Sequence, residues 1–183
     1  MSIRPDAKQL PLTPKRRGAL ILVFYATAWG IIGSSALTLP THYIAVTVLI
    51  SVFVIVAAFA PPFRSPVEKK RITNFPARFD GYRWTTIGQY TLIAAAVAVL
   101  VTTGRGHLVL PIICLIVGVH FYPLAWIFGQ SQYWATGSAM IALAIFGLVS
   151  AIDGNNLSVM RAAVGLGSAI VLWATSLDVL RCG

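Results

Sequence analysis

The feature that most constrains this chain is a long stretch without charge. No Asp, Glu, Lys or Arg occurs from Gly18 to Phe63. An apolar helix of about 20 residues crosses the hydrocarbon core of a bilayer, so this stretch has room for two spans. A secretory signal peptide has a shorter apolar region that ends at a small-residue cleavage site. We therefore interpret the first part of the stretch as an uncleaved membrane-spanning helix.

The rest of the chain repeats this apolar pattern. Of its 183 residues 57% are hydrophobic and only 10% are charged, and the mean hydropathy is +0.80. A soluble domain of this length needs more charge to cover its surface. Apolar runs of spanning length occur at residues 18–39, 42–60, 86–103, 107–128, 133–152 and 159–180. Because a lipid-embedded backbone must satisfy its own hydrogen bonds, each run is expected to be helical. The sequence predicts an all-α polytopic membrane protein, a bundle of six transmembrane helices.

Local signals suggest where some of these helices begin and how they pack. Pro40 favours ending the first helix, and Thr41 is a suitable N-cap for the second. The third span is rich in alanine from Ala94 to Ala98. Because small side chains let helices approach closely, we expect this span to be a central packing helix.

Charge sets the expected orientation. The net charge of +9 is concentrated in a basic tail at residues 1–17 and a basic loop at residues 61–85. The tail, the loop and the C-terminus carry five, six and one of the fourteen Lys and Arg, whereas the opposite side has only Arg105 and Arg161. The positive-inside rule then places both termini in the cytoplasm, with the spans in the inner (plasma) membrane. The basic segments are expected to contact anionic lipid headgroups. The sequence has no soluble element with a basic patch interleaved with aromatic residues, so it gives no indication of nucleic-acid binding.

The run His120-Phe121-Tyr122-Pro123 stands out within the fourth span. An ionisable side chain in hydrocarbon is costly and normally faces the bundle interior, a partner or a water-filled cavity. Pro123 cannot donate a backbone hydrogen bond, so the carbonyl of Val119 is left free beside His120. We therefore predict a polar pocket around His120 in the cytoplasmic half of the bundle.

The predicted topology brings other polar and aromatic side chains to a comparable depth. The candidate ligand-binding residues are His120, Tyr90, Gln89, Tyr25, Trp29, Tyr122 and Asp178. The alternative interpretation is structural: His120 hydrogen-bonds a neighbouring carbonyl or Tyr90 and stabilises helix packing. The sequence leaves both interpretations open.

Other kinds of site lack a pattern in the sequence. No metal site is expected, because His42 and His107 are predicted at the face of the membrane opposite His120. No Ser or Cys has a base at a characteristic spacing, so no catalytic residue is assigned. No nucleotide-binding motif occurs and no cofactor is expected. Cys114 and Cys182 do not have the spacing of a metal or redox pair.

These observations favour a protein that binds or transports a small molecule, with His120 orienting the ligand or exchanging a proton. One alternative is a membrane enzyme acting on a lipid-soluble substrate. Another is a scaffold that packs against partner membrane proteins, including a homo-oligomer. Ala163 and Gly167 in the sixth span have the small-x-x-x-small spacing that supports close helix packing.

The motif His120-Phe121-Tyr122-Pro123-Leu124-Ala125 resembles one in small bacterial six-helix integral membrane proteins of unknown function. In those proteins a His-Phe-x-Pro-Leu-Ala stretch occurs in a middle helix. The similarity covers mainly this helix and the general hydropathy. It implies a location in a bacterial inner membrane and assigns no activity.

Overall fold

The structure is a computed structural model that describes residues 14–59, 75–154 and 156–182, and these residues are almost entirely helical. The α-helices are α1 Pro14–Ser34, α2 Pro40–Phe59, α3 Phe75–Thr102, α4 Val109–Phe128, α5 Gln132–Ile152 and α6 Leu157–Cys182. A short 3-10 helix, η2 Gly106–Leu108, precedes α4. The prediction of an all-α protein with six helices is confirmed. In the described part of the chain, α3, α4, α5 and α6 contain segments long and apolar enough to cross a membrane, and α1 and α2 contain shorter apolar segments.

The turn between α1 and α2 differs from the prediction. Helix α1 ends at Ser34 instead of residue 39, and the amide of Leu37 donates to the carbonyl of Ser34 in the turn that follows. Helix α2 begins at Pro40 itself, so Thr41 is not its N-cap. Proline is well suited to the first helical position, because the amide that it lacks would have no partner there.

Helix α3 begins at Phe75, eleven residues before the predicted start of the third span at residue 86. Most of the distal part of the predicted loop is therefore helical. Charged residues such as Arg83 interrupt the apolar run of the sequence, but a helix can continue beyond the end of an apolar run. The prediction confused the edge of the apolar segment with the end of the helix. The rest of the loop, residues 60–74, and residues 1–13 of the tail lie outside the described residues.

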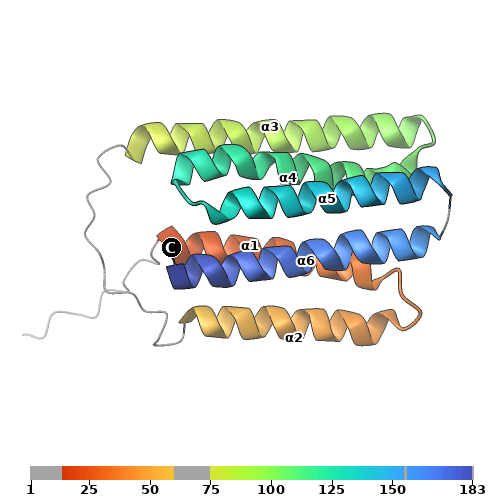
Figure 1. Cartoon of the computed structure of the whole chain (residues 1–183), viewed down its shortest axis with the longest axis horizontal. Coiled ribbons are helices and arrows are strands. Elements are labelled where there is room, and N and C mark those ends of the chain that lie inside the picture. The colour runs from red at the N-terminus through yellow and green to blue at the C-terminus, as the bar shows by residue number, and fades with distance from the viewer. Residues whose placement is uncertain (1–13, 60–74, 155, 183) are drawn as a thin grey trace, which may run out of the picture.

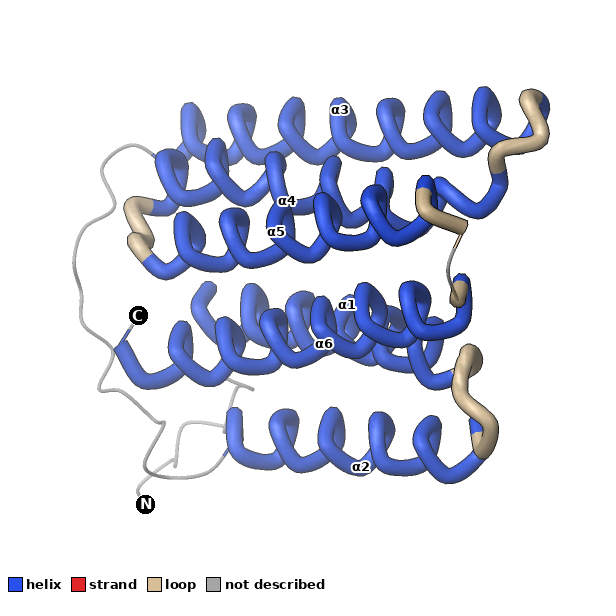
Figure 2. The backbone as a smooth tube through the Cα atoms, turned by 45° about the vertical axis from the view of Figure 1, so that its right-hand side comes forward, coloured by secondary structure: helices blue, strands red, loops and turns tan. Residues whose placement is uncertain are grey.

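The helices form a flattened bundle with α2 at one edge and α3 at the other (Figures 1 and 2). Helix α6 packs most extensively on α1, and α5 packs on both α4 and α6. Helix α2 rests against α1, and α3 rests against α4. The first helix begins and the last helix ends at the same end of the bundle (Figure 1).

The alanine-rich third span is not central, so that prediction is wrong. The membrane-spanning segment of α3 has no buried residue, and the helix packs mainly against α4. The central position belongs to α6, which has the largest buried share of the four long apolar segments. Small side chains permit close packing, but they do not decide which helix receives neighbours on several sides.

Candidate functional site

A polar contact between α1 and α3 joins two tyrosines. The hydroxyl of Tyr25 on α1 is hydrogen-bonded to the hydroxyl of Tyr90 on α3. Both side chains were predicted members of the site, and the structure brings them together. Both are also partly exposed, at 37% for Tyr25 and 51% for Tyr90. The pair therefore lies at an open seam between α1 and α3.

Thr86 carries an unpaired hydroxyl beside this pair. It lies on the same helical ridge as Tyr82 and Tyr90, four residues from each, so the three side chains share one face of α3. Its Oγ1 is buried and has no hydrogen-bond partner among the described residues. Neighbouring threonines behave differently: Thr85 donates to the carbonyl of Gly81 at 2.7 Å and Thr91 donates to that of Ile87 at 2.9 Å. Thr86 is therefore an exception that needs an explanation.

His120 lies on the side of α4 that faces α3. Its half-buried imidazole lies near the backbone of Thr85. This is the kind of contact that the structural interpretation expects. It also places the imidazole next to the helical turn of α3 that carries Thr86. Pro123 lies inside α4, which continues to Phe128.

Aromatic side chains pack beside the site, toward the end of the bundle where α1 begins and α6 ends (Figure 1). The ring of Tyr82 packs against Phe128 with centroids 5.9 Å apart, and Phe128 packs against Tyr133 at 6.4 Å. Phe121 approaches Tyr133 at 5.7 Å. We call Tyr25, Tyr82, Thr86, Tyr90 and His120 the tyrosine–histidine cluster.

The other predicted residues lie elsewhere or have less defined surroundings. Trp29 is buried, and its backbone carbonyl faces Gly165 of α6. Tyr122 turns toward α5, where its hydroxyl lies 3.1 Å from that of Ser138 and its ring packs on Trp134 at 5.0 Å. Gln89 is half-buried on α3, and Asp178 is half-buried on α6.

Sequence reasoning missed Tyr82 and Thr86. Tyr82 was assigned to the basic loop, and Thr86 was taken only as the start of a span. The signal that was available is the spacing of Tyr82, Thr86 and Tyr90 at intervals of four, which becomes visible once α3 is known to begin at Phe75.

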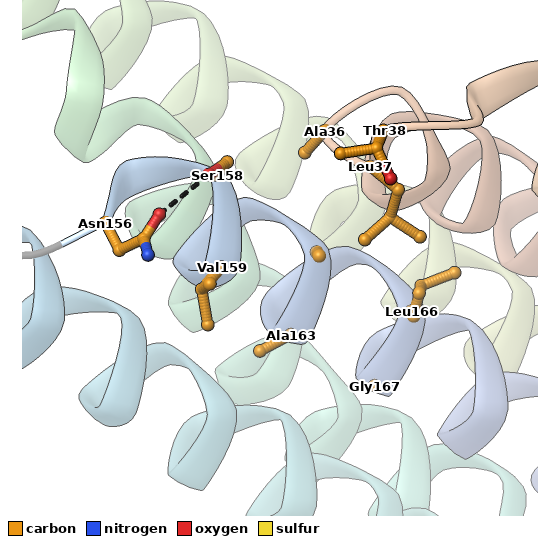
Figure 3. Close-up of a pocket in the computed structure, with 10 residues that line it drawn as sticks. Ala36, Leu37, Thr38, Asn156, Ser158, Val159, Ala163, Leu166 and Gly167 are labelled. Carbon is orange, nitrogen blue, oxygen red and sulfur yellow. Dashed lines mark hydrogen bonds between the residues drawn. The ribbon is translucent and has the colours of Figure 1, made fainter.

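A cavity lies at the opposite end of the bundle. It has a volume of about 510 Å³ and is formed by the α1–α2 turn and the first half of α6 (Figure 3). Its polar lining residues are Thr38, Asn156 and Ser158. None of the predicted site residues lines it.

The described side chains favour hydrogen bonding over metal chemistry. Among the residues searched in the described part of the chain, no group of three His, Cys, Asp or Glu side chains is placed to hold a metal ion. The cluster consists of phenols, one threonine hydroxyl and one imidazole. These groups recognise hydroxyl and carbonyl groups through hydrogen bonds.

The described chain is all-helical, and its four long apolar helices are compatible with a multi-pass membrane protein. No protein-family model, curated protein or solved structure matches the chain.

Proposed function

We propose that this protein binds a small, uncharged, membrane-soluble molecule with a carbonyl or hydroxyl group at the tyrosine–histidine cluster. The observation that carries the proposal is the unpaired Oγ1 of Thr86, on the same face of α3 as Tyr90. A buried polar group without a partner costs about 1–3 kcal/mol. In a bilayer core no bulk water is present to satisfy it. A ligand that hydrogen-bonds Thr86 removes this cost.

The chemistry of the cluster suits a neutral ligand. The Tyr25–Tyr90 contact uses one of the two hydroxyl protons, so the other phenol proton remains available to donate. Thr86 can both donate and accept. When one ring nitrogen of His120 donates to the Thr85 backbone, the other accepts. A carbonyl or hydroxyl group fits this set, whereas a charged ligand lacks a counter-ion among the cluster residues.

The exposure of the two tyrosines indicates how a ligand reaches the cluster. Tyr25 and Tyr90 are partly exposed at the seam between α1 and α3, on segments that lie within the apolar part of the helices. A surface at that depth faces lipid. The ligand therefore enters sideways from the bilayer, which requires it to dissolve there. If the protein is a transporter, as the sequence analysis proposed, binding of the ligand at this seam is the first step of transport.

We also propose that the protein lies in a bacterial inner membrane with the tyrosine–histidine cluster in the cytoplasmic half. The concentration of Lys and Arg in the tail and the loop supports this orientation. Helix α1 begins and helix α6 ends at the same end of the bundle (Figure 1), which supports placing both termini on one side of the membrane.

The proposal is tested by ligand-induced stabilisation of the full chain in nanodiscs, using a panel of uncharged alcohols, phenols and ketones. A ligand at 100 times its dissociation constant stabilises by about 2.7 kcal/mol, which a thermal unfolding assay resolves. We expect Thr86→Val and Tyr90→Phe to abolish the stabilisation by compounds that stabilise the parent chain. Both variants keep nearly the parent's shape: Thr86→Val replaces the hydroxyl with a methyl group, and Tyr90→Phe removes the phenol hydroxyl.

Thr91→Val is the matched control, because this exposed hydroxyl on α3 bonds only its own helix. It should retain the ligand response. If Thr86→Val responds like the parent, the site is not at Thr86 and the proposal is wrong. His120→Ala and His120→Phe distinguish the two interpretations of this histidine. If a variant folds but no longer responds to the ligand, His120 contacts the ligand. If neither variant assembles, His120 is a packing residue. Conversion of a stabilising compound to product would favour the enzyme alternative.

A further inference from the structure

We infer that the outer surface of α6 holds one phospholipid, with its head at the α1–α2 turn and one acyl chain along the helix. This site is separate from the tyrosine–histidine cluster and does not depend on it. The inference begins with two hollows that share Gly167. Because both are lined by this residue, the two hollows are neighbours on the surface of α6, and we call them together the α6 groove.

The first part of the groove is the cavity of about 510 Å³ in Figure 3, where Leu37 of the turn and Leu166 of α6 line opposite sides. The second part has a volume of about 440 Å³ and lies between α5 and α6. Its lining consists of Ala139, Ala142, Leu143, Gly167, Ile170 and Val171. Small residues on both helices, such as Ala139, Ala142 and Gly167, leave this hollow open instead of filling it with side chains.

Polarity changes along the groove in the way that an amphiphile requires. All residues lining the second part are apolar, and the polar lining residues are confined to the turn end. There the hydroxyl of Ser158 donates to Oδ1 of Asn156 at 2.9 Å, which leaves the amide NH₂ of Asn156 as a donor (Figure 3). Thr38 adds a hydroxyl from the opposite wall. These groups lie at the end of the membrane-spanning segment of α6, at the depth of lipid headgroups.

The length of the groove favours a lipid chain over a partner helix. From Val159 to Val171 the helix rises roughly 18 Å at 1.5 Å per residue. One leaflet of hydrocarbon is about 15 Å thick, half of the ~30 Å core, so one acyl chain fits along the groove. A partner's transmembrane helix would need a path along the whole ~30 Å. One turn beyond the groove on each helix, the hydroxyls of Thr136 and Thr175 are 2.6 Å apart and join α5 to α6.

The test fills the groove and measures phospholipid binding to the full chain. The probe is palmitoyl-oleoyl phosphatidylglycerol added to detergent-solubilised protein, followed by native mass spectrometry and thermal unfolding. Ala142→Leu and Ala163→Leu place larger side chains in the two parts of the groove. We expect each to weaken binding about tenfold, because a displaced chain loses its van der Waals contacts along the helices.

Ala174→Leu is the matched control on the same helix, since Ala174 is exposed and does not line either hollow. It should bind the phospholipid as the parent does. Ala142 is exposed, so its variant should fold even if Ala163→Leu does not. Equal binding by the parent, Ala142→Leu and Ala174→Leu would overturn the inference. So would a groove variant that converts a dimer to a monomer without changing lipid binding, because the groove would then be a helix–helix interface.

Discussion

Gly33 of α1 and Gly165 of α6 lie directly against each other. A Cβ atom added to Gly165 would come within 2.5 Å of the backbone nitrogen and Cα of Gly33, and within 2.9 Å of the carbonyl of Trp29. Real Cβ atoms do not approach backbone this closely. The two backbones can cross here only because neither residue has a side chain.

Gly165→Ala should therefore destabilise the bundle. The added methyl group meets backbone, which cannot rotate away, so the two helices must separate. Overpacking of this kind typically costs about 1–3 kcal/mol. Unfolding of the purified chain in mixed micelles measures the loss.

Gly88→Ala on α3 is the control for this change, because nothing lies within 4 Å of the added Cβ. It should leave stability unchanged or raise it slightly. Equal destabilisation by both substitutions would contradict close packing at Gly165.

Ser51→Ala should loosen the attachment of α2. The hydroxyl of Ser51 lies 2.7 Å from Oγ1 of Thr27 on α1 and accepts the indole N–H of Trp173 on α6 at 3.2 Å. Interhelical hydrogen bonds in membrane proteins contribute on average about 0.6 kcal/mol each to stability. We therefore expect the loss of two of them to lower the free energy of unfolding by about 1–2 kcal/mol. Denaturant unfolding measures it.

Thr102→Ala is a suitable comparison for Ser51→Ala. Its hydroxyl is exposed near the end of α3 and bonds carbonyls of its own helix. The free energy of unfolding of this variant should stay within about 0.5 kcal/mol of the parent's. A Ser51→Ala chain as stable as this control would mean that the three-helix contact contributes nothing.

Cysteine labelling in intact cells tests the orientation. In a Cys182→Ser background the remaining native Cys114 is fully buried. Arg105→Cys lies in the α3–α4 turn and Ser131→Cys in the α4–α5 turn, at opposite ends of the bundle (Figure 1). An impermeant maleimide added outside should label position 105 and leave position 131 unlabelled until the membrane is opened. Labelling of both positions from outside would exclude the proposed topology.

Tryptophan fluorescence tests which surfaces face lipid. Trp126 on α4 is 84% exposed, whereas Trp173 on α6 is 8% exposed. In single-tryptophan variants reconstituted with bromolipids, Trp126 should be quenched several-fold more strongly than Trp173. Similar quenching at the two positions would contradict the central place of α6.

The candidate site was partly predictable from the sequence. Tyr25 and Tyr90 were expected at the same depth, because depth follows from the spans and their alternating direction. Their hydrogen bond depends on how α1 and α3 rotate about their axes, which depth does not determine. The unpaired hydroxyl of Thr86 is a property of its surroundings, and no sequence pattern reveals it.

The sequence by itself determined that the described chain is helical, that it forms six α-helices, and that four of them are long and apolar enough to cross a membrane. These properties follow from composition along the chain, because hydrocarbon excludes charge and requires the backbone to satisfy its own hydrogen bonds. Only the tertiary structure decided that α6 is central and α3 peripheral. In a soluble protein the polar face of a helix reveals its exposed side, but lipid is as apolar as a protein core. Hydropathy therefore cannot distinguish a face that meets lipid from one that meets a helix, and close fits such as Gly33 on Gly165 make that choice.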